Sequence, residues 1–170
     1  MRSGGGKAKG ASFERKICKQ LSLYYSGGRR DDLFWRSAIS GGRASLQRHG
    51  LGRRNQAGDI TAIGGHDFLS NVFVECKSYK DLNLVGFLLF GTGKLQKFWD
   101  TALKQARASG KRYTLLIAKE NMLPVIVIAS PGWMSDPESP KERRAIIDGC
   151  DVYLFNDLFP KPKRVKPRIS

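Results

Sequence analysis

Apolar residues recur at two different spacings along this chain, and the spacing predicts which segments are helices and which are strands. Between residues 11 and 25, apolar side chains return every three or four positions, which is typical of a helix with one buried face. The same spacing runs through residues 94–108, and Gly110 just beyond them predicts the end of that helix. Residues 113–118 and 125–129 are almost entirely apolar, as expected of strands covered on both faces.

Between the two helices, the pattern predicts three further strands. A short strand is expected within residues 33–39. Residues 59–63 and 71–79 follow, and Gly64-Gly65 between them predicts a tight turn. We therefore expect these two strands to form an antiparallel hairpin.

The C-terminal part predicts one more helix and one more strand. Ser139 and Glu142 have the spacing of a capping box, and Pro140 suits a first helical position, so a short helix is expected to start there and to end at Gly149. Residues 152–155 then predict a last strand. The order of helix, strands, helix and strands predicts an α/β fold with a mixed sheet flanked by helices.

The length and composition fit one globular domain. The chain has 170 residues, of which 41% are hydrophobic, which is enough for a single core. Residues 1–10 are rich in glycine and lysine and predict a flexible basic arm. We expect the domain to span residues 11–158 and a basic tail to occupy residues 159–170.

The positive charge is concentrated at the two ends of the chain. The net charge is +15, and residues 1–58 hold 13 basic and 3 acidic residues. Residues 59–158 hold 12 of each, and residues 159–170 hold 5 basic residues and no acidic one. Such segregation indicates a polyanionic partner, most often a nucleic acid, whereas a solvated basic loop and tail are the alternative.

The basic residues near residues 41–58 form what we interpret as a basic insertion. Arginine side chains reach phosphates with paired donors, and glycines beside them allow the backbone to approach closely. The residues expected to contact the DNA backbone are Arg36, Arg43, Arg48, Arg53, Arg54 and Lys80.

Several other classes of protein are disfavoured. Three scattered cysteines, Cys18, Cys76 and Cys150, fit reduced thiols rather than a disulfide framework or a zinc site. The longest apolar stretch, residues 84–90, is far shorter than the roughly 20 residues of a membrane-spanning helix. Gly91-Thr92-Gly93-Lys94 lacks the first glycine of a phosphate loop, so no nucleotide cofactor is expected.

Three charged residues have a spacing suited to phosphodiester hydrolysis. Glu75 and Lys77 alternate along one strand, so both side chains emerge on one face, while Cys76 points to the other. If the hairpin forms, Asp59 lies beside them. Oxygen ligands of this kind suit Mg²⁺ or Mn²⁺, and such a metal ion activates water and neutralises phosphate charge. The pattern fits equally well a Glu–Lys pair on an exposed strand face, with Asp59 as a turn residue.

Four short motifs strengthen the first interpretation. They are KGASFER at residues 9–15, RSAISG at 36–41, GDI at 58–60 and VECK at 74–77. In this order they resemble the motifs of the PD-(D/E)XK nuclease superfamily, and they are most similar to those of archaeal-type Holliday junction resolvases, including versions carried by viruses. The resemblance covers about residues 9–118. It implies a restriction-endonuclease-like αβββαβ core, a homodimer and metal-dependent nicking of branched DNA in recombination and repair.

The resemblance also implies a role for individual residues. Asp59 and Glu75 would bind Mg²⁺ or Mn²⁺ together with the backbone carbonyl of Cys76, and Glu14 would reach the metal directly or through water. Lys77 would orient the attacking water and stabilise the developing charge, and Ser40 would contact the scissile phosphate. The stretch between Ser40 and Asp59 is longer and more basic than in that group, and residues after about 130 have no counterpart there, so the preferred substrate is less well determined than the chemistry.

We therefore predict a dimeric, metal-dependent endonuclease that cuts four-way DNA junctions. It would act in the cytoplasm, or in the host cytoplasm if a virus encodes it. Two alternatives stay open. One is the same chemistry on duplexes, flaps or a specific site, and the other is a basic nucleic-acid-binding protein without catalytic activity.

Overall fold

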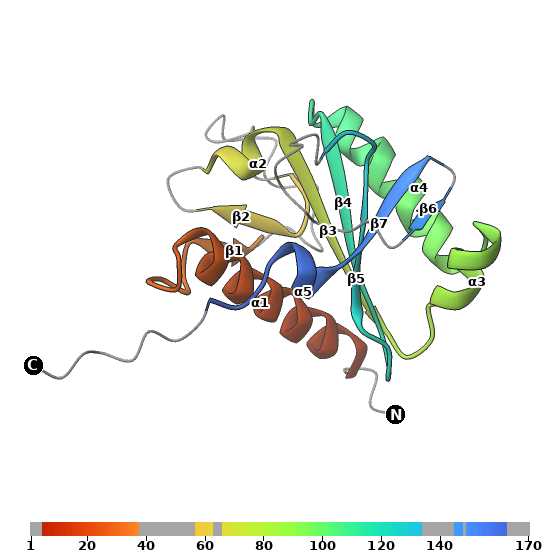
Figure 1. Ribbon diagram of the computed structural model, residues 1–170, viewed down its shortest axis with the longest axis horizontal. Coiled ribbons are helices and arrows are strands. Elements are labelled where there is room, and N and C mark those ends of the chain that lie inside the picture. Colours follow the sequence, from red (N-terminus) through yellow and green to blue (C-terminus); the bar gives the residue numbers. More distant parts are fainter. Residues whose placement is uncertain (1–4, 38–56, 63–65, 134–144, 148, 163–170) are drawn as a thin grey trace, which may run out of the picture.

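The computed structural model describes residues 5–37, 57–62, 66–133, 145–147 and 149–162, and its centre is a five-stranded sheet (Figure 1). The strands lie in the order β3-β4-β5-β7-β6. Only β3 and β4 run parallel, and the other neighbours are antiparallel. The strand bounds are β3 Val72–Tyr79, β4 Tyr113–Glu120, β5 Val125–Ala129, β6 Ala145–Ile147 and β7 Cys150–Leu154.

Helices cover both faces of this sheet, as Figure 1 shows. The long helix α1 (Gly5–Tyr25) lies on one face, and α3 (Leu84–Phe90) and α4 (Lys94–Ala108) lie on the other. Two short helices, α2 (Asp67–Asn71) and α5 (Phe155–Leu158), precede β3 and follow β7. No helix within the described ranges is long and apolar enough to cross a membrane.

Each face of the sheet has its own core, because successive side chains of a strand point to opposite faces. On the α1 face, Ile17 and Leu21 pack with Ile117 of β4. On the opposite face, Leu95 and Trp99 of α4 pack with Leu116, the next residue toward the start of β4. A sheet buried on both faces explains why β4 and β5 read as continuous apolar runs. The predicted α/β class with a mixed sheet between helices is confirmed.

A second, two-stranded sheet lies beside the main sheet and is joined to it at β3. It consists of β1 (Phe34–Arg36) and β2 (Ile60–Ala62), which pair antiparallel. The link to the main sheet is a single parallel bridge between Gly58 and Val74 of β3. This junction places the start of β2 beside the middle of β3.

The predicted hairpin between residues 59–63 and 71–79 is wrong. The short helix α2 intervenes, with the Nδ1 atom of His66 accepting a hydrogen bond from the backbone N of Phe68 at 3.2 Å. The ammonium of Lys111 donates to the carbonyls of Leu69, at 2.6 Å, and Ser70, at 3.2 Å. With a helix capped at both ends between them, β2 and β3 meet in parallel rather than antiparallel orientation.

Two further boundaries differ from the expectation. The first helix begins at Gly5, so residues 5–10 are helical where a flexible arm was expected. Extending a formed helix by a turn costs much less than nucleating one, so glycines at its start can be included. Near the C-terminus, Ala145–Ile147 forms edge strand β6 rather than part of a helix, because it pairs with β7. The proposed capping box at Ser139 lies outside the described residues.

Candidate active site

Hydrogen bonds to β3 and to Ser37 hold Asp59 beside the middle of β3. Its backbone N donates to the carbonyl of Val74 at 2.8 Å, and its own carbonyl accepts from the N of Ser37 at 2.8 Å. The backbone N of Cys76 donates to Oδ2 of Asp59, also at 2.8 Å. Gly58 permits this approach because its φ is +92° and a Cβ there would lie 2.3 Å from the Val74 carbonyl. The carboxylate therefore reaches the Glu75–Lys77 segment, although the hairpin that suggested this proximity does not form.

Glu75 and Lys77 lie on one face of β3, as the alternation predicts. Their side chains form an ion pair with each other. Cys76 points instead into the core beneath α1. The ammonium of Lys77 also lies 5.3 Å from the ring centroid of Phe98 on α4, a cation–π contact. Glu75 and Phe98 together fix the position of Lys77.

Glu14 reaches the same region from α1. Glu14 lies at the edge of the buried stripe of α1, and the residue is only 8% exposed. The guanidinium Nε of Arg36, on β1, donates to Oε2 of Glu14. Arg36 was predicted as a DNA contact, and the structure also makes it the counter-ion of a candidate metal ligand.

The electrostatics show that these groups influence one another. Burial is the main cause that raises the pKa of Glu14, and the negative charge of Asp59 raises it further. The hydrogen bond and charge of Arg36 and the charge of Lys77 act in the opposite direction, but the pKa remains raised. An acidic group whose ionised form is disfavoured in this way has a reason to bind a cation.

Lys77 remains a cation at neutral pH. Burial alone lowers its pKa, but Glu75 more than compensates through its charge and hydrogen bond, and Asp59 adds to this effect. The pKa of Lys77 is therefore raised. The side chain suits the stabilisation of negative charge rather than the removal of a proton from water.

The buried cysteines do not suit nucleophilic catalysis. Burial, followed by the charge of Glu14, raises the pKa of Cys18 to about 12. Burial likewise raises the pKa of Cys76 well above its usual range. Because the thiolate is the nucleophile, both side chains are inert at neutral pH.

The donor chemistry of the site fits a hard divalent cation. Glu14, Asp59 and Glu75 offer carboxylate oxygens, which Mg²⁺ and Mn²⁺ prefer. Two of them already hold a basic counter-ion, Arg36 or Lys77. In the described part of the chain, no three acidic, histidine or cysteine side chains converge as a metal site. Each of these ion pairs is made by one carboxylate oxygen, Oε2 of Glu14 or Oε1 of Glu75.

One further residue predicted to contact DNA, Lys80, is exposed just beyond the end of β3. The other residues predicted for the site lie outside the described residues: Ser40, Arg43, Arg48, Arg53 and Arg54.

Sequence reasoning missed the contact between Phe98 and Lys77. Phe98 belongs to the apolar face of α4, and nothing in the spacing distinguishes a core residue from one beneath a functional lysine. It also missed the half-exposed Trp35, because a tryptophan within a strand normally indicates core packing.

The mixed sheet flanked by helices, with acidic and basic side chains gathered around β3, is consistent with the fold of PD-(D/E)XK endonucleases. Residues 5–144 match the family described as "Phage putative PDDEXK endonuclease". The chain belongs to this phage endonuclease family. No curated protein and no solved structure matches the chain.

Proposed function

We propose that this chain is a Mg²⁺- or Mn²⁺-dependent endonuclease that cuts branched DNA, with four-way junctions as its preferred substrate. The observation that carries the chemistry is the hydrogen bond from Cys76 to Asp59, which brings an acidic side chain from just before β2 to the Glu75–Lys77 pair. The family adds that the chain is an endonuclease. As a phage enzyme, it would act in the host cytoplasm, where its DNA substrate lies.

In this proposal, the metal is held by Asp59, Glu75 and the carbonyl of Cys76, and Glu14 contributes directly or through water. A bound divalent cation would lower the pKa of the attacking water and neutralise charge on the phosphate. Lys77 donates to the attacking water or to a phosphate oxygen, which its charged state at neutral pH permits. Ser40 contacts the scissile phosphate.

Lys77 pairs with Oε1 of Glu75, and the second oxygen of that carboxylate could hold a metal. Phe98 gives the ammonium of Lys77 a further favourable contact through the face of its ring. This contact would hold the lysine near the reacting groups if Glu75 turned toward a metal. We propose that Phe98 is a positioning residue for Lys77.

DNA binding relies on the basic groups around the site. Arg43, Arg48, Arg53, Arg54 and Lys80 are proposed to contact phosphates, together with Arg36. The charge segregation supports this interface, because the first 58 residues hold 13 basic and only 3 acidic residues. Six to ten phosphate contacts predict a fall in affinity of about 10³- to 10⁵-fold between 50 and 200 mM salt.

A homodimer would place two active sites across a junction, and α3 is our proposed interface. This helix exposes an apolar face, with Val85 56%, Leu89 68% and Phe90 73% exposed. Contiguous apolar surface of this kind marks an interaction site. Leu89→Glu should yield a folded monomer by light scattering, and a dimer that survives this substitution would exclude α3 as the interface.

The function is tested with labelled DNA of three shapes: a four-way junction, a flap and a linear duplex. Each is incubated with wild type or Lys77→Met, in Mg²⁺, in Mn²⁺ or in chelator. We expect paired nicks in the junction by wild type with metal only, and no cutting by Lys77→Met. Preferential cutting of the linear duplex would instead support a nuclease with another substrate. Binding without any cutting would refute the proposed chemistry.

A further inference from the structure

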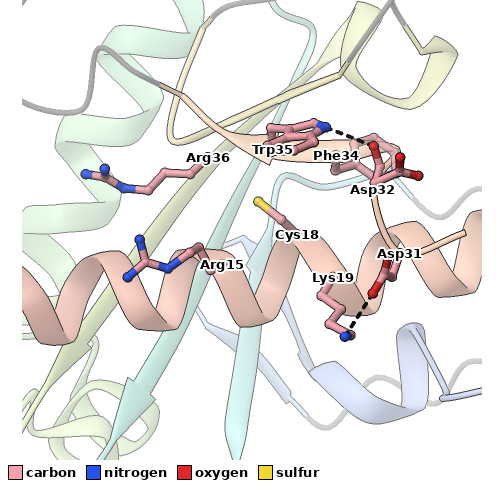
Figure 2. Close-up of a pocket in the computed structure, with 8 residues that line it drawn as sticks. All are labelled: Arg15, Cys18, Lys19, Asp31, Asp32, Phe34, Trp35 and Arg36. Atoms are coloured by element: carbon pink, nitrogen blue, oxygen red, sulfur yellow. Dashed lines mark hydrogen bonds and ion pairs between the residues drawn. The ribbon is translucent and has the colours of Figure 1, made fainter.

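A groove lies between α1 and β1 (Figure 2). Its volume is about 490 Å³, which lies in the range of small-molecule and nucleotide pockets. Phe34 and Trp35 line it from β1, and Cys18 lines it from α1. Arg15 and Arg36 also belong to its lining. Because Arg36 pairs with Glu14, one residue of the groove lining also contacts a proposed metal ligand.

Trp35 is the unusual feature of this groove. Its side chain is 50% exposed, although tryptophan is among the residues that gain most from burial. The indole Nε1 donates to the backbone carbonyl of Asp32 at 2.9 Å. This hydrogen bond satisfies the polar edge of the ring and limits its rotation, so the apolar face is presented in a fixed orientation.

Positive charge is gathered on one side of the groove. In Figure 2, the guanidinium groups of Arg15 and Arg36 lie on the same side of the groove, one from α1 and the other from β1. Arg15 is exposed and has no hydrogen-bonding or ionic partner among the described residues. Two guanidinium groups from different elements match the geometry and charge of a phosphate.

The acidic residues that line the groove have basic partners of their own, while Arg36 is paired with Glu14 outside the lining. Asp31 pairs with Lys19 at 2.8 Å, and Asp32 pairs with Arg30 at 2.8 Å. Both carboxylates therefore have their own basic partner. The groove as a whole complements an anion attached to a flat ring.

We propose that this groove binds one unpaired nucleotide of the DNA substrate, with its base stacked on Trp35 and its phosphate held by Arg15 and Arg36. The proposal rests on the proposed function and specifies its substrate class as DNA in which a nucleotide is unstacked, as at a branch point, flap or bulge. Every base has a π face, so stacking on Trp35 selects unpaired DNA without selecting a sequence. A fully paired duplex offers no base to the groove.

A phosphate at Arg36 would also affect the active site. Arg36 is the counter-ion of Glu14, and a phosphate competes with that carboxylate for the same guanidinium. Occupation of the groove by unpaired DNA therefore frees Glu14 for its role at the metal. The groove couples recognition of substrate shape to assembly of the site.

The test measures binding in chelator, so that cleavage does not enter. Fluorescence anisotropy compares three duplexes of one sequence: fully paired, with a single-nucleotide bulge, and with an abasic bulge. Wild type should prefer the bulge to both other duplexes. Trp35→Ala should lose about 5- to 150-fold in affinity for the bulge, little for the paired duplex, and all discrimination between bulge and abasic bulge.

Three variants serve as controls. Trp35→Phe retains an aromatic face and should keep most of the preference for the bulge. Met122→Ala removes another exposed apolar side chain, between β4 and β5, and should change nothing. Arg15→Gln alters an exposed helical residue that does not support the fold, and it should lower the salt dependence of bulge binding by about one phosphate contact.

The outcomes separate this inference from the proposed function. If Trp35→Ala still discriminates the bulge from the abasic bulge as well as wild type does, the proposal that the groove binds an unpaired nucleotide is wrong. This result would hold whether or not the protein cuts DNA. If Trp35→Ala does not fold, an unchanged salt dependence in Arg15→Gln overturns the proposal. A wild type that binds bulges through Trp35 but cuts no DNA with metal would instead refute the proposed nuclease chemistry and leave the groove intact.

Discussion

Replacement of Asp59 by alanine should destabilise the fold as well as abolish cleavage. The carboxylate of Asp59 accepts the hydrogen bond from the backbone N of Cys76, at 2.8 Å, on the side of β3 that faces away from β4. Cys76 is 5% exposed, and Asp59 is 7% exposed, so water does not readily replace the lost acceptor. An unsatisfied buried N–H costs about 1–3 kcal/mol, which for a chain of this size lowers the melting temperature by about 2–12 °C.

Asp59→Asn separates the two roles of this side chain. Its amide oxygen can still accept from Cys76, and loss of the negative charge removes the repulsion from Glu14. We expect its stability to lie within about 1 kcal/mol of wild type. Cleavage should nevertheless be lost, because a neutral amide is a poor ligand for Mg²⁺.

Thermal and chemical unfolding without metal provide the assay for these variants. Asp100→Ala, an exposed acidic residue of α4, is the matched control and should change stability by less than about 0.5 kcal/mol. The reasoning is refuted if Asp59→Ala is as stable as wild type. It is also refuted if Asp59→Asn is as unstable as Asp59→Ala, since the hydrogen bond would then not explain the loss.

Three further predictions concern the surroundings of the site. Folding raises the pKa of Glu14 above its usual value of 4.5, so the ionised form of Glu14 lowers stability. Wild type should therefore lose stability relative to Glu14→Gln as pH rises through that raised pKa. Denaturation at pH 4 and at pH 7 measures this difference. Gly58→Ala should lower the free energy of unfolding in denaturant by more than about 2 kcal/mol, because the new Cβ meets both a positive φ and the Val74 carbonyl. As the control, Gly10→Ala in α1, where nothing lies near the new Cβ, should leave stability unchanged or raise it. Lys111→Met should cost about 1–3 kcal/mol by leaving two carbonyls of α2 without their donor, and equal stability in urea would contradict that role.

The sequence predicts best the elements whose own periodicity determines their environment. The helix expected at residues 94–108 coincides with α4, because Leu95, Trp99 and Ala102 form a regular buried stripe. Residues 125–129 coincide with β5, since a strand buried on both faces leaves little freedom in its composition. Local pattern is sufficient where one face must be buried along the whole element.

Elements whose form depends on distant partners were predicted less well. The pair Gly64-Gly65 favours a tight turn, but α2 follows and is held by Lys111, which lies more than 40 residues further along the chain. Ala145–Ile147 is a strand because β7 offers a free edge, and three residues contain no periodicity that could show this.

The candidate site illustrates the same division. Alternation along β3 correctly separates Glu75 and Lys77 from Cys76. The ion pair between Glu14 and Arg36 joins elements that are 22 positions apart, and only tertiary packing brings them together.

The central claim is that Asp59 belongs to a metal-dependent DNA-cleaving centre. It is tested most directly by single-turnover cleavage of a labelled four-way junction, with wild type and Asp59→Asn compared at concentrations that saturate DNA binding. We predict that wild type cuts with Mg²⁺ and stops when chelator is added, and that Asp59→Asn binds the junction but leaves it intact. Cutting in chelator, or cutting by Asp59→Asn at the wild-type rate, would contradict the claim.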